Sequence, residues 1–180
     1  MSRIDESMEF IPVRIAVLTV SDSRKMVDDR SGQVLVDRLR EAGHTLADRK
    51  IIPDERAEIA AQLRAWIADT KVDVVISTGG TGLTGRDVTV EAHRDVYEKE
   101  IEAFGTVFTM VSMQKIGTSA VQSRATGGVA GGTYLFALPG SPGACKDGWD
   151  EILLKQLDYR HRPCNFVEIM PRLEEHLRRK

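Results

Sequence analysis

Runs of apolar residues alternate along this chain with segments in which apolar residues recur at helical spacing. Arg14–Val20 (RIAVLTV) is an apolar run rich in β-branched residues, which is typical of a strand covered on both faces. Comparable runs near Asp48–Ile52, at Val72–Ser77 and at Thr133–Leu138 predict further strands, and a shorter run at Phe166–Ile169 predicts a last one.

The segments between these runs predict helices. Ser31 is a suitable N-cap for a first helix, and Gly43 stands where that helix should stop. From Thr89 to Gln114 the pattern is helical but interrupted at Gly105, which predicts two helices or one with a break. Two further apolar stripes indicate helices: Ile59, Leu63, Trp66 and Ile67 in one, and Trp149, Ile152, Leu153 and Leu157 in the other. We expect both tryptophans in the core or at a subunit interface.

Strands that alternate with helices predict an α/β fold, a three-layer sandwich with a mainly parallel sheet flanked by helices. The 180 residues are expected to form a single domain, with residues 1–12 and 172–180 as flexible tails. Ligands of such sheets bind beyond the carboxyl ends of the strands. The loops expected to meet there are Ser21–Ser31, Pro53-Asp54, Ser77–Asp87 and Pro139–Gly143.

Composition and charge narrow the function classes. The chain is 42% hydrophobic and 29% charged, with a formal net charge of -2, so nothing global argues for binding nucleic acid or a membrane. The N-terminus lacks the apolar core of a signal peptide and no apolar run could span a membrane, so we expect a cytoplasmic protein. Cys145, Cys164 and the scattered histidines have neither zinc-site nor disulfide spacing.

The stretch VVISTGGTGLTGRD, Val74 to Asp87, imitates two phosphate-binding motifs. A P-loop needs Lys and then Ser or Thr after its second glycine, but Arg86 and Asp87 occupy those places. A dinucleotide fingerprint opens the first βαβ unit and has an acidic residue about 20 residues later. This loop follows the third predicted strand, and the region near Ile101–Val107 looks helical. The P-loop interpretation therefore fails, and the position of the loop argues against the dinucleotide fingerprint.

The loop nevertheless has the chemistry of an anion site. Closely spaced glycines can adopt φ > 0 and let backbone N–H groups converge on an anion, and the following helix offers its positive end. Threonine hydroxyls and an arginine add donors, although a purely structural turn is the alternative. The residues expected to contact substrate here are Thr78, Gly79, Gly80, Thr81, Gly82 and Arg86.

Several stretches together resemble a known family. They are TGGTGLTGRDVT (Thr78–Thr89), LTVSDSR (Leu18–Arg24), DRSG (Asp29–Gly32) and LPGSP (Leu138–Pro142). In combination they resemble the MoaB/MogA family of molybdenum cofactor biosynthesis proteins over about residues 14–166, and QSR (Gln122–Arg124) with RPCNF near the end indicates the MoaB branch.

The resemblance implies a MogA-like fold that binds molybdopterin, a pterin-dithiolene with a terminal phosphate. Active members use Mg²⁺ and ATP to adenylylate that phosphate and release pyrophosphate. They are homo-oligomers, trimers or hexamers, and other molybdenum cofactor enzymes are candidate partners. By motif position, the two functional carboxylates fall on Asp54 and Asp87, and the substrate-binding loops fall on Thr78–Gly82 and on Pro139, Gly140 and Ser141.

The residues fit this chemistry. Adenylyl transfer joins two polyanions, so the site needs charge neutralisation and alignment more than a general base. Mg²⁺ binds one or two carboxylates together with substrate oxygens and waters, which gives Asp54 and Asp87 a catalytic role as metal ligands. Each also has a structural alternative: Asp54 could cap a helix, and Asp87 could cap the next one or pair with Arg86.

Flanking residues allow two interpretations as well. Ser141 followed by Pro142 is a common helix start, and the same loop could donate to a pterin or a phosphate. After the first strand, Asp22 and Ser23 could line the site while Arg24 and Lys25 contact phosphate, or all four could be solvated. Asp28 and Asp29 are interpreted as surface charge, and Glu91 as a favourable charge at a helix start.

The leading hypothesis is a Mg²⁺- and ATP-dependent molybdopterin adenylyltransferase. The first alternative is a non-catalytic molybdopterin-binding or scaffold protein of the same pathway. The second is a dinucleotide-dependent oxidoreductase, which the position of the glycine loop disfavours.

Overall fold

The computed structural model describes residues 3–178 and contains one six-stranded sheet with strand order β3-β2-β4-β7-β6-β5. The neighbours β3, β2, β4 and β7 run parallel, whereas β6 and β5 are added antiparallel. A separate pair, β1 with β8, is antiparallel. The strands are β1 (Arg3–Ile4), β2 (Arg14–Val20), β3 (Thr45–Ile52), β4 (Val74–Thr78), β5 (Lys99–Glu100), β6 (Thr126–Ala130), β7 (Thr133–Leu138) and β8 (His161–Arg162).

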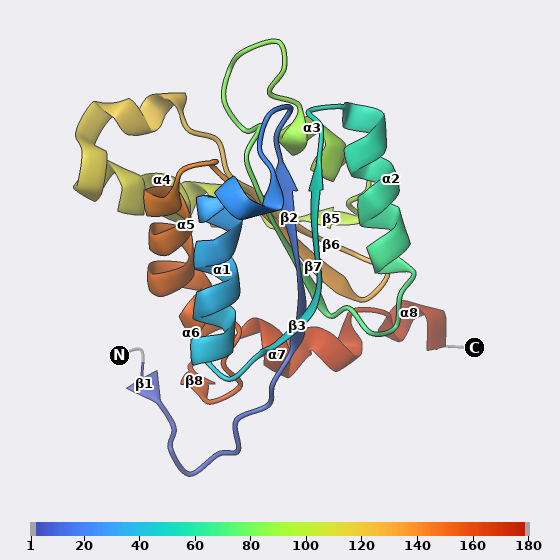
Figure 1. Ribbon diagram of the computed structural model, residues 1–180. Coiled ribbons are helices and arrows are strands. Elements are labelled where there is room, and N and C mark those ends of the chain that lie inside the picture. Colours follow the sequence, from blue (N-terminus) through green and yellow to red (C-terminus); the bar gives the residue numbers. More distant parts are fainter. Residues whose placement is uncertain (1–2, 179–180) are drawn as a thin grey trace.

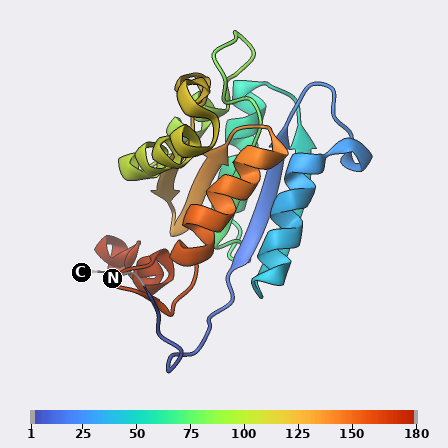
Figure 2. The same cartoon turned by 90° about the vertical axis from the view of Figure 1, so that its left-hand side faces the viewer.

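Helices cover both faces of the large sheet, which makes three layers (Figures 1 and 2). On one face pack α1 (Arg30–Glu41), α4 (Glu102–Ile116) and α5 (Pro142–Gly148), and α5 continues through a π-helical turn, η3 (Trp149–Leu153), into α6 (Leu154–Gln156). On the other face pack α2 (Arg56–Ile67) and α3 (Thr89–Arg94). The short remaining elements are η1 (Met26–Asp28), η2 (Gly117–Gln122), α7 (Phe166–Ile169), η4 (Met170–Arg172) and α8 (Glu175–Arg178).

Alternation along the strands builds a core on each side of the sheet. In β2, Ile15 and Val17 belong to the cluster under α1 and α5, whereas Ala16 and Leu18 belong to the cluster under α2. Both tryptophans lie in these cores, which is one of the two locations predicted for them: Trp66 is 4% exposed and Trp149 is 1% exposed. The predicted mainly parallel α/β fold is confirmed.

One predicted strand is wrong. Phe166–Ile169 forms helix α7, because Asn165 caps it by accepting a hydrogen bond from the Glu168 N–H at 2.8 Å. The Phe166 ring packs on Tyr134 and Phe136 of β7. Its apolar character therefore reflects packing of the first residue of a helix on the sheet and not strand pairing.

Two predicted helix boundaries also shift. The N-cap of α1 is Asp29, which accepts a hydrogen bond from the Gly32 N–H at 2.9 Å, so Ser31 lies inside the helix. Between Thr89 and Gln114 there are two helices, as one alternative predicts, but Gly105 lies within α4. A Cβ at Gly105 would stand 2.7 Å from the Ala125 carbonyl oxygen, so this glycine permits a close contact and does not end a helix.

The chain ends carry short elements. The terminal segments expected to be flexible contain β1, which pairs with β8, and α8. Their flexibility stays a prediction, and residues 1–2 and 179–180 lie outside the described range. Within residues 3–178, no helix combines the length and apolar character that crossing a membrane requires.

Candidate functional site

A cavity of about 700 Å³ lies at the carboxyl ends of β2, β4 and β7. Because these strands are parallel and adjacent, the loops that follow them open at the same edge of the sheet. The predicted loops therefore meet around one space. Its lining residues are Val20, Ser21, Ser23, Arg24, Asp54, Gly79, Gly80, Thr81, Gly82, Asp87, Gln122, Ser123, Pro139, Gly140, Ser141 and Pro142.

Two of the predicted site residues, Thr78 and Arg86, are not in this lining. Thr78 is buried beneath it, where its hydroxyl donates to the Pro139 carbonyl at 3.0 Å and lies 3.1 Å from the Cys145 sulfur. Thr78 thus ties the glycine loop to the PGSP loop (residues 139–142) from below. That Thr78 and Arg86 contact substrate stays a prediction.

Arg86 forms an exposed ion-pair cluster at the rim. Its guanidinium donates to both Asp22 carboxylate oxygens, at 2.8 and 3.0 Å, and to Glu55 at 2.7 Å. The Asp22 and Glu55 carboxylates together raise the pKa of Arg86, and the bond from Arg86 lowers the pKa of Asp22. The arginine therefore bridges three loops and does not close over the glycine amides.

The glycine loop is shaped by close approach to its surroundings. Gly79 and Gly80 have φ of +98° and +62°, the left-handed region that glycine tolerates best. A Cβ at Gly79 would stand 2.3 Å from the Val20 carbonyl, and one at Gly82 would stand 2.8 Å from the Asp87 carboxylate. These positions therefore need glycine for conformation or for space.

Asp87 is held by the loop itself. Its carboxylate accepts from the Thr84 N–H at 2.8 Å and from the Thr84 hydroxyl at 2.6 Å, and it lies against the Gly82 backbone. The Thr84 hydroxyl contributes most to a lowered pKa for Asp87, so the group is an ionised carboxylate. It neither caps α3, whose N-cap is Val88 without a side-chain bond, nor pairs with Arg86.

Asp54 stands in a different electrostatic environment. Helix α2 has Glu55 at its N-cap position, so the Asp54 side chain is not the cap. Burial raises the pKa of Asp54, and the negative charges of Asp22 and Asp87 raise it further. Ionising Asp54 beside Asp22 and Asp87 therefore costs free energy when no cation is bound, and a bound cation reverses that cost.

The oxygens around Asp54 suit Mg²⁺. Asp54 and Asp87 supply two carboxylates, and the buried hydroxyl of Thr89, which has no hydrogen-bond partner, faces Gly80 beside Asp54. Among residues 3–178, no group of three or more His, Cys, Asp or Glu side chains forms a preassembled metal site. This donor set fits a hard cation that takes its remaining oxygens from substrate and water.

Of the two basic residues predicted to contact phosphate, Arg24 lines the cavity and Lys25 does not. Arg24 donates to the Ser31 hydroxyl at 2.7 Å and to the Gly140 carbonyl at 3.0 Å. It therefore holds the PGSP loop against the start of α1 and brings a positive charge to the cavity wall.

The interpretation of Asp29 as surface charge is wrong. Asp29 is 3% exposed, and its carboxylate accepts from the Thr19 hydroxyl at 2.8 Å and from Arg49 at 2.9 Å. Burial alone would raise the pKa of Asp29, but Arg49 and the other donors hold it below its usual value. The D-x-x-G spacing of a helix cap is the signal that could have revealed its structural role.

Arg124 and Glu91 form a pair that sequence reasoning missed. Arg124 donates to Glu91 and to backbone carbonyls of the glycine loop. The residues are 33 positions apart, and no sequence pattern signals the contact.

Comparison with known proteins gives this site a family. The sequence model described as "Probable molybdopterin binding domain" matches residues 16–159. The chain is 52% identical over 160 residues to molybdenum cofactor biosynthesis protein B of Escherichia coli K12, covering 89% of this chain and 94% of that protein. This chain belongs to the molybdenum cofactor biosynthesis protein B (MoaB) family.

Solved structures of MoaB proteins share its fold. A crystal structure of molybdenum cofactor biosynthesis protein B has a TM-score of 0.83 and 37% identity, covering 92% of this chain and 98% of the other. The molybdopterin biosynthesis enzyme MoaB of Thermus thermophilus has a TM-score of 0.71 and 31% identity, covering 78% of this chain and 89% of the other. Both the MoaB/MogA resemblance and the fold that it implies are confirmed.

Proposed function

We propose that this MoaB protein is a Mg²⁺- and ATP-dependent molybdopterin adenylyltransferase of the cytoplasm. The supporting observation is that Asp54 and Asp87, from two different loops, place their carboxylates against the backbone of Gly80 and Gly82 in one cavity. Two carboxylates beside a loop built for phosphate suit a reaction in which a divalent cation accompanies two polyanions.

The two substrate loops divide the binding work. The backbone N–H groups of Gly80 and Thr81 donate to phosphate oxygens, with Arg24 as the nearby positive charge, because the Gly79 N–H already donates to the Leu138 carbonyl at 3.2 Å. The Ser141 hydroxyl accepts from the Ala144 N–H at 3.1 Å as the N-cap of α5, which leaves its own proton free to donate to the pterin or its phosphate. Substrate phosphates compete with Asp22 and Glu55 for Arg86 at the rim.

The chemistry requires alignment more than proton transfer. An oxygen of the molybdopterin phosphate, already ionised near neutral pH, forms a bond to the α-phosphorus of ATP. The bond from that phosphorus to the α–β bridging oxygen breaks, and its electron pair leaves with pyrophosphate. Asp54 and Asp87 would hold Mg²⁺, which supplies neutralisation of the phosphate oxygens when bound.

One assay tests this function. The purified protein is incubated with molybdopterin, ATP and MgCl₂, and adenylylated molybdopterin and pyrophosphate are sought by mass spectrometry. Product that depends on all three components is expected. Tight molybdopterin binding without product would instead establish the non-catalytic binding or scaffold role, and an omitted-Mg²⁺ reaction serves as the control.

We also propose that the protein is a homo-oligomer, a trimer or hexamer, in which α4 contacts a second copy. Four apolar side chains recur at three-residue intervals along α4 and are 42–61% exposed: Val107, Met110, Met113 and Ile116, called here the α4 stripe. An apolar cavity of about 340 Å³ adjoins Val107, and α4 lies at an outer edge of the molecule (Figure 1). Apolar side chains exposed in this number along one helix mark an interaction surface.

A further inference from the structure

The side chain of Arg124, between η2 and β6, reaches both sides of the glycine loop. Its Nε donates to the carbonyls of Thr81 at 3.0 Å and Gly82 at 3.1 Å, and its Nη2 donates to the carbonyl of Asp87 at 3.2 Å. The loop tip between these anchor points is exposed: Leu83 is 70% exposed, and a Cβ at Gly85 would meet no atom within 4 Å. Arg124 thus spans the base of a tip that has little packing of its own.

Glu91 holds the guanidinium in this position. It accepts from Nη1 and, at 3.2 Å, from Nη2 of Arg124, and the bond from Arg124 lowers the pKa of Glu91. Glu91 lies in the first turn of α3, directly after the loop. One planar fork therefore connects the start of α3 to both ends of the loop, a geometry that arginine provides and lysine does not.

The contacts of Arg124 converge on the orientation of Asp87. The Gly82 backbone lies against the Asp87 carboxylate, since a Cβ at Gly82 would stand 2.8 Å from it, and the Thr81 and Asp87 carbonyls on either side both accept from Arg124. Rotation of the Thr81–Gly82 peptide unit, or of the unit that follows Asp87, would break a bond to the guanidinium and shift the Gly82 backbone or the Asp87 carboxylate. Arg124 itself is not in the lining of the substrate cavity.

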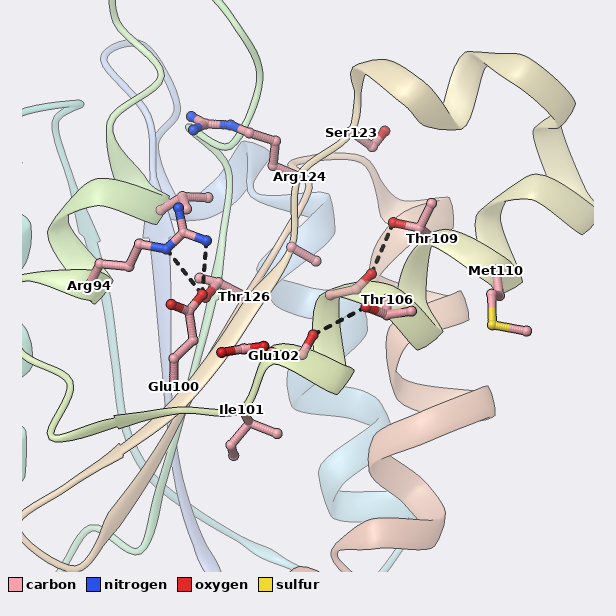
Figure 3. A pocket seen from close by; sticks show the side chains of 13 residues that line it. Arg94, Glu100, Ile101, Glu102, Thr106, Thr109, Met110, Ser123, Arg124 and Thr126 are labelled. Atoms are coloured by element: carbon pink, nitrogen blue, oxygen red, sulfur yellow. Dashed lines mark hydrogen bonds and ion pairs between the residues drawn. The ribbon is translucent and has the colours of Figure 1, made fainter.

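A neighbouring cavity of about 730 Å³ is lined by Arg124 and by a second arginine, Arg94, with which Arg124 can be compared (Figure 3). Arg94 and Glu100 face each other there and are joined at 2.8 and 3.0 Å, whereas Arg124 extends away from Thr106 and Thr109 of α4. Both arginines thus pair with a glutamate beside one cavity. Of the two, Arg124 also binds loop carbonyls.

We propose that Arg124 is a positioning residue for the reaction: it fixes the Asp87 carboxylate and the loop amides without touching substrate. The inference rests on the proposed adenylyl transfer for its kinetic consequence only. Ordering of the loop is a separate consequence that needs no substrate.

Arg124→Gln and Arg94→Gln test this proposal together. Hydrogen exchange followed by mass spectrometry should show amides of residues 79–88 exchanging about 10-fold faster in Arg124→Gln, with Arg94→Gln like the wild type. With molybdopterin, ATP and MgCl₂, kcat of Arg124→Gln should fall about 10- to 100-fold while KM and the melting temperature change little. Arg124→Lys should not restore kcat, and Glu91→Gln should give a smaller loss in the same direction.

Three results would overturn the proposal. They are loop exchange in Arg124→Gln equal to that in Arg94→Gln, faster loop exchange with unchanged kcat, and full rescue by Arg124→Lys. A wild-type protein without turnover would overturn the proposed function instead, and the exchange comparison would then decide the role of Arg124 by itself. If Arg124→Gln does not fold, Glu91→Gln carries both measurements.

Discussion

The carboxylate of Asp54 occupies the space that a side chain at Gly80 would need. A Cβ on Gly80 would stand 2.7 Å from Asp54 Oδ1 and 2.4 Å from the Thr89 hydroxyl oxygen. Gly82 has the same relationship to Asp87, at 2.8 Å. Each carboxylate therefore lies against a glycine of the loop, and the glycines serve the placement of charge as much as the shape of the backbone.

Gly80→Ala should damage both stability and activity. The substitution strains a backbone with φ of +62° and pushes on Asp54 and Thr89, so we expect a loss of about 1–2 kcal/mol in the free energy of unfolding. Displacement of the carboxylate should lower the adenylylation rate by roughly 100-fold. Denaturant unfolding and the mass-spectrometric assay measure the two effects.

Gly85→Ala is the control from the same loop. Its Cβ would meet no atom within 4 Å, and Gly85 is not among the glycines with positive φ. Both quantities should stay at wild-type values. Equal losses in Gly80→Ala and Gly85→Ala would show that the contact with Asp54 is unimportant.

Asp87→Asn should abolish turnover and spare molybdopterin binding. The amide oxygen can still accept from Thr84, so the loop keeps its fold, but the charge that would hold Mg²⁺ is gone; we expect kcat to fall by about 100-fold or more. Asp69→Asn is the matched control, because Asp69 also accepts a local backbone bond, from Lys71 at 2.9 Å, and is exposed. An unchanged rate in Asp87→Asn would remove Asp87 from the mechanism.

Acid should destabilise the protein through buried histidines. Burial lowers the pKa of His44 to about 4, although the charge of Asp158 opposes this, and burial lowers the pKa of His93 to about 3. Near pH 5 the unfolded chain binds protons at these residues and the folded protein does not, so stability is complete above about pH 6.5 and is lost as pH falls toward about 4.

Unfolding by denaturant at about pH 7, 6 and 5 measures this slope. His44→Asn keeps an acceptor for the Val13 N–H, which His44 Nδ1 accepts at 3.2 Å, and should reduce the loss between pH 7 and pH 5 by about 1–2 kcal/mol. His176→Asn, at an exposed position, should leave the slope unchanged. A slope in His44→Asn identical to that of the wild type would contradict the assignment.

The part of the site that sequence could predict depends on strand direction. Parallel strands bring the loops after β3, β4 and β7 to one edge, so a correct α/β assignment already places Asp54, Asp87 and the PGSP loop together. Motif spacing then identifies which loop residues are special. Neither step requires knowledge of side-chain contacts.

What could not be predicted depends on contacts between distant segments. Asp29 is buried because Thr19 and Arg49 reach it from β2 and β3, and their positions follow from pairing in the sheet. Phe166–Ile169 is too short for periodicity to separate a strand from a helix, and the Asn165 cap decides for the helix. Gly105 resembles a helix breaker until the approach of Ala125 is known.

Met110→Asp should reduce the mass of the assembly in solution. Met110 is 61% exposed in the middle of the α4 stripe, and burying a carboxylate there against a second copy would cost several kcal/mol. Light scattering should therefore show the wild type as an oligomer and Met110→Asp shifted toward the 20.0 kDa chain. Val27→Asp, at an 88% exposed apolar position outside the stripe, is the control and should keep the wild-type mass. An oligomer that survives Met110→Asp would place the interface on another surface. A carboxylate in the centre of an apolar contact loses its hydration, and movement of the residues around the edge of the contact cannot restore it.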